Sequence, residues 1–459
     1  MTRALTLTAL LACASATAMG QSMAQSATQT DTPVSTQRGL IGPDVIYQSV
    51  TSINSYGPVG TKRAYIGDSY TCNIGDEPLL FGFGANGSPV LVFNLYRLHD
   101  GRIEQIGMSW AKHACCAIQG NGCGIPCTSG PGLGAGCRDI YSAGWNASQS
   151  NLGPRSAINA FTGEIPGIEG VSGSSIAGRL QVETDDLGQE GAGASYYFEG
   201  VYVGSDDAPA GNAYNNATYR KVTINELNFS MSPTGATFEG EPAINAWKEA
   251  DPAVTSTFAD VPGEGRFHVA AKASDNGDGT YRYEYAIFNL NSHRSGGSFS
   301  VPLPVGASVS NVGFHDVDYH SGEPYDNTDW TISTDGGAVT WSSPETFAEN
   351  ENSNALRWGT MYNFWFDSDA APDTGSVTLG LFRPGSPADV SINLPAPSGA
   401  GCNEADIAEP LGTLDFSDVS AFLLAFSTAD PAADLAVPFG TFDFSDVAAF
   451  LGAFGAGCP

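Results

Sequence analysis

The feature that most constrains this chain is a tandem repeat near its C-terminus. The segment 406–418, DIAEPLGTLDFSD, returns 28 positions later as DLAVPFGTFDFSD at 434–446, and an apolar stretch follows each copy. In each copy a Ser-Asp pair, beginning at Ser417 and Ser445, can satisfy the free amide groups of a helix's first turn. Apolar residues then fall at i, i+3, i+4 and i+7: Val419, Phe422, Leu423 and Phe426, repeated by Val447, Phe450, Leu451 and Phe454. This spacing predicts two amphipathic helices that pack face to face, since neither is stable alone.

Two cysteines, Cys402 and Cys458, lie just outside the predicted helix pair. A disulfide between them would close nearly the whole module and stabilise it by about 4 kcal/mol in the chain-entropy model. The recurring Leu/Phe-Asp-Phe-Ser-Asp-Val and Ala-Phe-Leu-x-Ala-Phe segments, with the flanking Gly-Cys pairs, resemble the GC-type dockerin-like module of many secreted bacterial proteins, over about 401–459. The resemblance implies docking onto a cohesin-like or cell-surface partner. The docking surface is expected at the duplicated positions Asp415, Phe416, Asp418, Phe422, Leu423, Asp443, Phe444, Asp446, Phe450 and Leu451.

Dockerins carry duplicated calcium loops, so the resemblance also raises Ca²⁺ as a cofactor. Such a loop places oxygen ligands at positions 1, 3 and 5, glycine at 6 and an acidic residue at 12. If Gly412 and Asp418 take positions 6 and 12, Leu411 stands at position 5 and Asp406 is one residue out of register; the second copy has Val437 and Phe439 at positions 3 and 5. Two hypotheses remain. Either the candidate ligands Asp406, Asp418, Asp434 and Asp446 bind calcium, or the module is a metal-free hairpin held by Phe packing and one disulfide.

The N-terminus has the pattern of a Sec-type signal peptide. Arg3 precedes an apolar run that extends to about residue 18, and small residues near 18–24 offer a cleavage site. We assign 1–24 to the signal peptide and the Gln/Ser/Thr-rich 25–39 to a disordered leader. No later stretch is apolar for 18 residues, so no transmembrane segment is expected. The chain is predicted to be secreted or attached to the cell surface.

The cysteine count supports export. After Cys13 of the signal peptide, eight cysteines remain, an even number that predicts disulfides: Cys72, Cys115, Cys116, Cys123, Cys127, Cys137, Cys402 and Cys458. Six of them fall within 72–137, which predicts a stapled, loop-rich region. Zinc ligation by Cys123, Cys127 and Cys137 is the alternative, which an oxidising compartment disfavours. Because neighbouring cysteines rarely pair with each other, Cys115 and Cys116 are each expected to bridge outward.

The charge balance excludes one class of partner. The chain has 49 acidic and 19 basic residues, for a net charge of −30. Phosphate backbones and anionic lipid surfaces would repel such a protein. We therefore expect no nucleic-acid partner.

The body of the chain, from about 40 to 395, is rich in glycine, aromatic and β-branched residues with frequent turn signals, which predicts a mostly β structure. It is too long for one ordinary core. We expect a Cys-rich β region at 40–175, a β-sandwich at 176–395, a Pro/Gly linker at 396–401 and the dockerin-like module at 402–459. The segments 95–107, 109–113 and 354–364 resemble stretches of uncharacterised exported bacterial proteins that often carry the same module.

Individual strands of the predicted sandwich can be read from the pattern. Within 281–287, Tyr281, Tyr283, Tyr285 and Ile287 alternate onto one face, and the Asn-Gly and Asp-Gly pairs of 275–279 predict a hairpin turn back to a strand at 266–272. Further short strands are predicted near 298–301, 309–314, 330–333, 339–342, 362–366, 377–382 and 390–394.

Polar clusters offer two candidate sites for chemistry. On a strand, Asp316, Asp318 and His320 would share one face, and Glu323 or Asp326 would return from the next turn. This set could bind Ca²⁺ or a transition metal, or supply a carboxylate pair for hydrolysis; the alternative is a polar strand edge that caps neighbouring loops. The second cluster, formed by His99, Asp100, Glu104 and His113, has a similar pair of interpretations: a metal site, or a turn followed by a strand and a packed histidine.

No short motif identifies an enzyme. The chain lacks a Gly-x-Ser-x-Gly in a strand-to-helix context, a His-Glu-x-x-His and a phosphate-binding loop. The favoured hypothesis is a non-catalytic binding or surface-architecture protein that docks through its C-terminal module, with extracellular polysaccharide as a candidate ligand. The alternative is a secreted carbohydrate-active enzyme with a dockerin-like tail, and some of the seven tryptophans could then stack on sugars.

Overall fold

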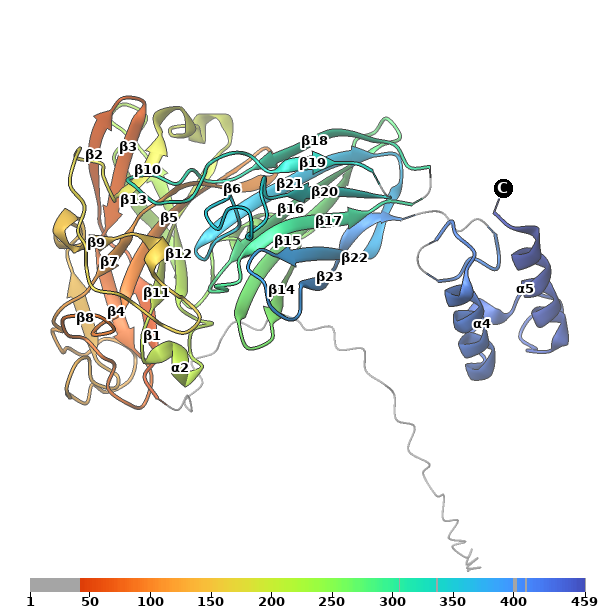
Figure 1. The fold of residues 1–459 in the computed structure, drawn as a ribbon, viewed down its shortest axis with the longest axis horizontal. Helices are drawn as coiled ribbons and strands as arrows, with labels where there is room; N and C mark the ends of the chain where they lie inside the picture. Colours follow the sequence, from red (N-terminus) through yellow and green to blue (C-terminus); the bar gives the residue numbers. More distant parts are fainter. Residues whose placement is uncertain (1–41, 305, 336, 399–402, 409–410, 459) are drawn as a thin grey trace, which may run out of the picture. The chain divides into compact units, whose positions relative to one another are not determined.

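The computed structural model describes residues 42–304, 306–335, 337–398, 403–408 and 411–458. They form a β-rich body and a C-terminal helix pair, labelled in Figure 1. The predicted signal peptide, the leader and Cys402 lie outside the described residues. No helix in the described part of the chain is long and apolar enough to cross a membrane.

The first half of the body is built from two antiparallel sheets. A three-stranded sheet has the order β1-β4-β8, and the main path of a ten-stranded sheet has the order β13-β12-β11-β5-β6-β10-β3-β2. Off this path, β7 pairs with β5, and β9 pairs with β7. The strands are β1 (Val45–Ser49), β2 (Ile53–Val59), β3 (Lys62–Gly67), β4 (Ser69–Asn73), β5 (Val90–His99), β6 (Arg102–Met108), β7 (Ala111–His113), β8 (Arg138–Tyr141), β9 (Leu152–Gly153), β10 (Leu180–Glu183), β11 (Ser195–Val203), β12 (Ala217–Ile224) and β13 (Met231–Phe238). Short helical turns connect them: α1 (Ala143–Asn146), η1 (Gln149–Asn151), η2 (Arg155–Ala157), η3 (Thr184–Asp186), η4 (Glu190–Ala192) and α2 (Asp207–Ala210).

The second half is the predicted β-sandwich. Its sheets have the orders β14-β15-β16-β21-β18 and β19-β20-β17-β22-β23, all antiparallel. The elements are α3 (Asn245–Ala250), β14 (Thr255–Val261), β15 (Gly265–Asp275), β16 (Tyr281–Asn289), β17 (Gly296–Pro302), β18 (Val309–His315), β19 (Thr331–Ser333), β20 (Ala338–Ser342), β21 (Thr360–Ser368), β22 (Ala371–Leu381) and β23 (Asp389–Ser398). Every strand predicted in this half is present, and the turn at 275–279 joins β15 to β16 as expected.

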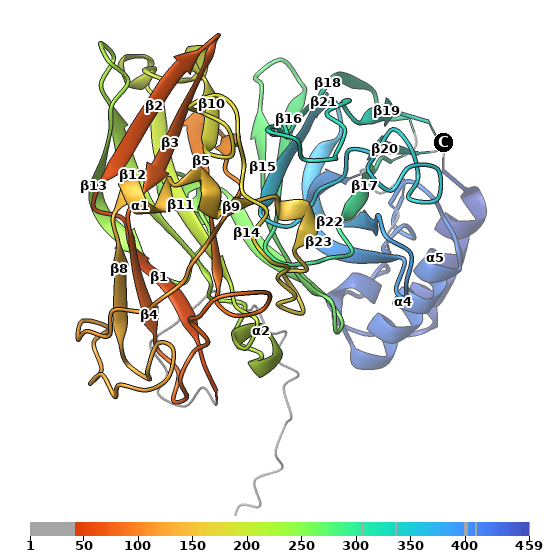
Figure 2. The ribbon, with the colours of Figure 1, turned by 60° about the vertical axis from the view of Figure 1, so that its left-hand side comes forward.

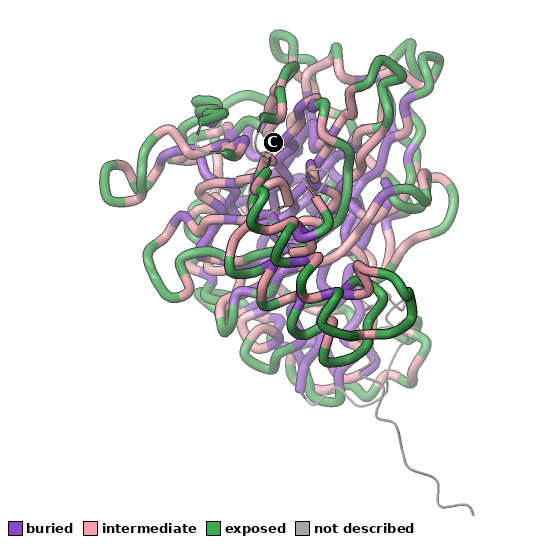
Figure 3. The backbone as a smooth tube through the Cα atoms, turned by 90° about the vertical axis from the view of Figure 1, so that its right-hand side faces the viewer, coloured by how far each residue is buried: buried purple, intermediate pink, exposed green. Residues whose placement is uncertain are grey.

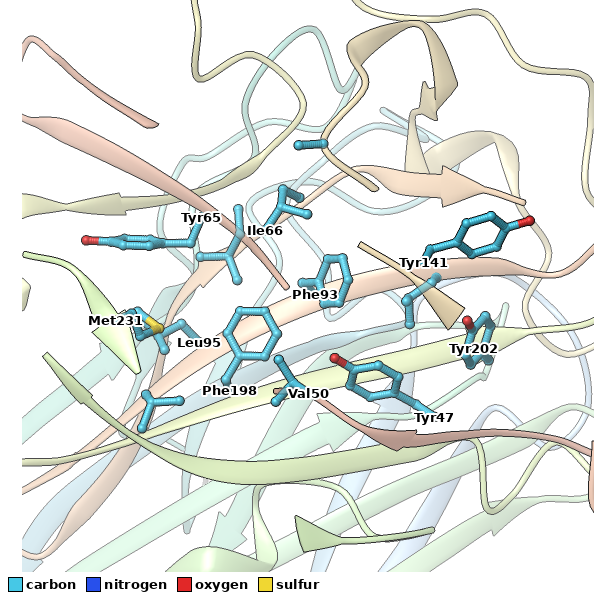
Figure 4. Close-up of a cluster of buried hydrophobic side chains, with 14 of the residues drawn as sticks. Tyr47, Val50, Tyr65, Ile66, Phe93, Leu95, Tyr141, Phe198, Tyr202 and Met231 are labelled. Carbon is cyan, nitrogen blue, oxygen red and sulfur yellow. The ribbon is translucent and has the colours of Figure 1, made fainter. Parts of the chain in front are cut away.

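Strand β5 shows why the sheets stack. Its sequence VLVFNLYRLH is almost continuously apolar, the pattern of a strand covered on both faces. Leu91, Phe93 and Leu95 enter the core of the first half, drawn in Figure 4, whereas Val90 and Val92 enter a second core. That second core also contains Ala286 and Phe288 of β16, so one face of the ten-stranded sheet packs on a sheet of the sandwich.

Strand β16 repeats this arrangement. Tyr283, Tyr285 and Ile287 are buried in the third core, inside the sandwich, and Tyr281 packs at its edge, which confirms the predicted shared face. Figure 2 shows these strands among their neighbours, and Figure 3 shows that buried residues gather in the interior while exposed residues lie mostly at the periphery.

The sheet change does not fall at the predicted boundary near 175. Strands β10 to β13 belong to the ten-stranded sheet, so the change of sheet comes between Phe238 and Thr255. Strand β23 continues to Ser398 and includes the first residues of the predicted linker. The pairings of β10 with β3 and β6 are long-range, which is why a local composition shift did not reveal them.

The C-terminal repeat forms helices α4 (Phe416–Thr428) and α5 (Phe444–Ala456), with the turn η5 (Pro431–Ala433) between them. Each helix begins two residues earlier than predicted. Asp415 and Asp443, rather than Ser417 and Ser445, are the N-caps and accept the Ser417 and Ser445 backbone N–H groups at 2.6 and 2.7 Å. A carboxylate is as effective a cap as a hydroxyl, so both residue types were compatible with the sequence.

Candidate functional site

The helix pair is held by two equivalent phenylalanines. Phe422 and Phe450 are each 1% exposed, and their rings stack with centroids 4.1 Å apart and an interplanar angle of 15°. Ala405 and Ala433 complete the fully buried core, with Val419 and Phe426 among the residues packed around it. The two Phe side chains proposed for the docking surface are therefore the centre of the module's core.

Four other repeat positions lie at the surface. Phe416 and Phe444 are each 79% exposed, and Leu423 and Leu451 are each 58% exposed. Leu423 follows Phe422 directly, which places it about 100° around the helix and off the buried face. The module thus displays an apolar pair from each copy, with the same exposure in both.

The acidic positions of the repeat have structural partners. Both oxygens of Asp418 accept backbone N–H groups: Oδ1 from Ile407 and Ala408, and Oδ2 from Asp415, each at 2.9 Å. Asp446 repeats this with Leu435, Ala436 and Asp443, also at 2.9 Å, and these bonds lower the pKa of Asp446. Asp418 and Asp446 are 0% and 1% exposed, so they close the loops from inside rather than forming a docking surface.

The first aspartate of each loop also accepts a backbone hydrogen bond. Oδ2 of Asp406 accepts the Gly412 N–H at 2.6 Å, and Oδ2 of Asp434 accepts the Gly440 N–H at 2.5 Å. Carboxylates of the predicted ligand set thus face backbone donors, whose positive ends oppose a cation, and Leu411 supplies no side-chain oxygen at position 5. Within the described residues there is no group of three or more His, Cys, Asp or Glu side chains that could hold a metal ion.

The Asp316 cluster lines a hollow of about 260 Å³ at the surface of the body, which we call the Asp316 pocket. Its residues are Lys62, Gln105, Ile106, Gln181, Val182, Glu183, Asp186, His315, Asp316, Val317, Asp318 and His320. Strand β18 ends at His315, so residues 316–320 are an extended loop and do not form the predicted strand face. The pocket still brings Asp316, Asp318 and His320 together.

The ionisable side chains that line the pocket differ in burial and in their hydrogen-bond partners. Burial raises the pKa of Asp316 to about 6, and a hydrogen bond from Asn354 Nδ2 to Oδ2 at 2.5 Å opposes this rise. Asp318 is exposed and lies 3.7 Å from the Lys62 ammonium. Both ring nitrogens of His320 have hydrogen-bond partners. Nε2 lies 2.8 Å from the Met108 carbonyl oxygen, which can only accept, so Nε2 carries the proton; Nδ1 then accepts from the Ser321 hydroxyl. Burial lowers the pKa of His320 to about 4.

Glu323 is not part of the pocket lining. Its carboxylate accepts the backbone N–H groups of Arg155 at 2.5 Å and Ser156 at 3.2 Å, and so caps the turn η2. The carboxylate that was predicted to pair with Asp316 therefore caps a neighbouring loop, which is the role that the alternative interpretation of this cluster gave it.

The second predicted cluster does not assemble as a site. His99 ends β5 and contacts Asp100, the first residue of the turn before β6, at 3.5 Å. Glu104 instead pairs with Arg97 at 2.9 Å and Arg102 at 3.1 Å. His113 is buried, and burial together with neighbouring Lys112 lowers its pKa to about 4.

A buried arginine joins the two halves of the body, and sequence reasoning missed it. Arg155 is 3% exposed and donates to the carbonyls of Ser109, Gly359 and Phe93 at 2.5, 2.9 and 3.0 Å, and to Asn94 Oδ1 at 2.9 Å. Burial lowers its pKa to about 10. Its partners are 46 to 204 residues away in sequence, so no local pattern could have identified it.

The predicted stapling of the Cys-rich region is confirmed in part. Disulfides join Cys72 to Cys123 and Cys127 to Cys137, whereas Cys115 and Cys116 do not bridge outward and lie side by side. Cys458 is disulfide-bonded. Bridges of this kind are those of an oxidising compartment.

Together these features define a class: a disulfide-stapled protein of stacked β-sheets with a C-terminal helix pair. No family model and no curated protein matches the chain. Among solved structures, the chain is similar to an exo-chitosanase of Amycolatopsis orientalis (10% identity, 72% of this chain and 25% of that one, TM-score 0.16). It is also similar to the N-terminal domain of a Streptococcus gordonii adhesin (9%, 73% and 62%, 0.18) and to the B domain of a biofilm associated protein (9%, 78% and 88%, 0.16).

These likenesses carry no argument about function, because every TM-score is low. The chain spans about a quarter of the length of the chitosanase that it matches.

Proposed function

We propose that this protein is a secreted or cell-surface β-rich protein that attaches, through its C-terminal helix pair, to a cohesin-like protein on the cell exterior. The observation that carries the proposal is the duplicated apolar surface formed by Phe416, Leu423, Phe444 and Leu451, two residues from each copy. Exposed leucine and phenylalanine have no role in the module's own core. They are the side chains that a protein partner buries most favourably.

The electrostatics define the partner further. The sequence contains no lysine or arginine after Arg383, so every charged side chain of the module is acidic. A matching partner surface has an apolar centre and a basic rim, since acidic groups would be repelled. The β-rich body is then the part presented outside the cell, as a binding or architectural domain.

The test compares cell attachment of the full-length protein and two double variants. Leu423→Asp/Leu451→Asp places a charge in each apolar pair. Ser417→Asp/Ser445→Asp adds the same two charges to the first turn of each helix, where an anion is favourable and about 120° around the helix from the leucines. Each purified protein is added to washed cells of the producing bacterium, and the fraction retained is measured.

Retention should fall at least tenfold for the leucine variant and change less than twofold for the serine variant. Protease treatment of the cells beforehand should abolish retention, because the partner is a protein. Equal retention of both variants would refute docking through this surface.

A second function is favoured by the Asp316 pocket. A carboxyl group with a pKa of about 6 beside exposed Asp318 and Lys62 is suited to proton transfer near neutral pH, as in a carbohydrate-active enzyme. The test is a polysaccharide degradation and binding screen with the wild-type protein and Asp316→Asn. Soluble product that disappears in Asp316→Asn would establish the enzyme; binding that the substitution leaves unchanged would establish a recognition domain.

A further inference from the structure

Two cysteines at the edge of the stapled loops stand apart from the disulfides. Within the described residues, Cys115 and Cys116 are the cysteines outside a disulfide, and Cys116 is exposed. Their Sγ atoms are 2.6 Å apart. That separation is well inside the contact distance of two non-bonded sulfur atoms and approaches the bond length of about 2.05 Å.

We propose that Cys115 and Cys116 form a reversible disulfide with each other, which makes this surface turn a redox-responsive site. The oxidant is a small-molecule or protein disulfide of the extracellular space. One cysteine thiolate attacks that disulfide, forms a mixed disulfide and releases a thiol. The neighbouring thiolate then attacks the mixed disulfide, closes the ring and releases the second thiol, so two protons and two electrons leave the protein and the oxidant gains them.

The surrounding side chains hold the turn in place. The Tyr141 hydroxyl donates to the Cys116 carbonyl at 2.8 Å and accepts the Cys116 N–H at 3.2 Å. Tyr141 is itself fixed in a ring stack between Phe81 and Trp145, with centroids 6.3 and 6.1 Å away. Because the Cys116 backbone is fixed on both sides, the two sulfur atoms need little movement to bond.

A buried cation lies under the same ring. Lys112 is 1% exposed and its Nζ is 3.6 Å from the Tyr141 ring centre. Burial lowers the pKa of Lys112 to about 7, and the nearby Asp139, Cys115 and Cys116 oppose this change. The hydrogen bond with Cys115 and burial raise the pKa of the Cys116 thiol, and the charge of Lys112 opposes this rise.

Geometry also predicts that this bond is the most easily reduced in the Cys-rich region. Adjacent Cα atoms are about 3.8 Å apart across a trans peptide, less than the roughly 4.4 Å at which disulfides become common. The Cα atoms are farther apart in both existing bridges, at 5.6 Å for Cys72–Cys123 and 4.3 Å for Cys127–Cys137. A strained, exposed bond has the more oxidising potential, so a mild reductant should open Cys115–Cys116 first.

The experiment uses the full-length protein, prepared without reductant, incubated with oxidised glutathione, and then denatured and alkylated with N-ethylmaleimide. The peptide that contains Cys115 and Cys116 should carry no adduct and should be lighter by two hydrogen atoms than its reduced form. Graded dithiothreitol should then yield a doubly alkylated peptide before Cys72 or Cys123 reacts. Alkylation of both residues before reduction, or a bridge from either to another cysteine or to glutathione, would overturn the proposal.

The variant Cys116→Ser provides the matched control. It should leave one alkylated thiol, at Cys115, while Cys72–Cys123 and Cys127–Cys137 stay intact in the same peptide map. Phenylarsine oxide, which bridges two thiols, should bind the mildly reduced wild-type protein and fail to bind Cys116→Ser. Equal binding to both proteins would show that the two sulfurs do not act as a pair, and would refute the site.

Discussion

The Phe422–Phe450 stack should determine whether the C-terminal helix pair exists as a folded unit. Substituting Phe450 by Ala removes a ring that is 1% exposed and lies 4.1 Å from its partner. Buried Phe→Ala changes cost about 3–5 kcal/mol. A module of about 55 residues has a net stability of roughly 3–8 kcal/mol at typical values per residue. The substitution should therefore remove most of the free energy of unfolding of the helix pair.

Hydrogen exchange on the full-length protein measures this directly. In the wild type, amides of α4 and α5 should be protected by the full opening free energy of the module. In Phe450→Ala that protection should fall by about a hundredfold or more, since each 1.4 kcal/mol is a factor of ten, while β16 in the body keeps its protection.

The repeat offers a matched control. Phe444→Ala removes the same side chain from the same helix, but at a position that is 79% exposed. Protection in α5 should change by less than about threefold, because surface substitutions stay within about 0.5 kcal/mol. If Phe450→Ala and Phe444→Ala had equal effects, the Phe stack would not be the core of the module and the assignment of Phe444 to the docking surface would lose its basis.

Three further predictions concern the body and the loops. Burial raises the pKa of Asp207 to about 8, so the native state binds more protons than the unfolded state between about pH 4 and 8, and the free energy of unfolding should fall by up to about 1.4 kcal/mol per pH unit across that window. In Asp207→Asn this part of the slope should vanish in urea titrations; an unchanged slope would contradict the assignment. Arg155→Met should lower the free energy of unfolding by about 3–5 kcal/mol, because several buried acceptors would lose their hydrogen-bond donor. The exposed control Lys221→Met should change it by less than about 0.5 kcal/mol. Similar values for the two variants would refute the role of Arg155 in joining the two halves of the body. Removal of divalent cations with EDTA should leave hydrogen exchange in α4 and α5 unchanged, and a loss of protection would restore the calcium hypothesis.

Local patterns predicted the strands of the sandwich because their causes are local. The alternation of Tyr281, Tyr283 and Tyr285 and the turn chemistry of 275–279 are complete within a few residues. The same is true of the turn at Asp100 and Gly101, where both residues have positive φ, of 50° and 80°.

The polar positions were harder to predict because distant partners determine their roles. Strand β18 ends at His315, whose Nε2 contacts the Gln105 carbonyl 210 residues away at 3.2 Å. Glu323 caps η2, whose residues lie 168 positions away in the sequence. The local sequence showed only that Glu323 is a carboxylate close to Asp316 and Asp318, and could not reveal this partner. The spacing of Leu423 placed it on the apolar helix face, and the repeat also placed it in the predicted docking surface. The second helix covers only a narrow stripe, and Leu423 lies outside it at the surface.

The acidic loops connect the module's fold to its proposed function. In each copy the aspartate that ends the loop accepts three backbone N–H groups. These hydrogen bonds draw the loop together, as a bound calcium ion does in a calcium-binding loop. The loop is thus closed by hydrogen bonds within the chain. Because no lysine or arginine follows Arg383, the module has a net negative charge, which favours a partner with basic groups around an apolar centre that meets exposed Phe416 and Leu423. Attachment through this surface should therefore weaken as ionic strength rises and stay insensitive to chelators, a combination that separates it from docking through calcium-filled loops.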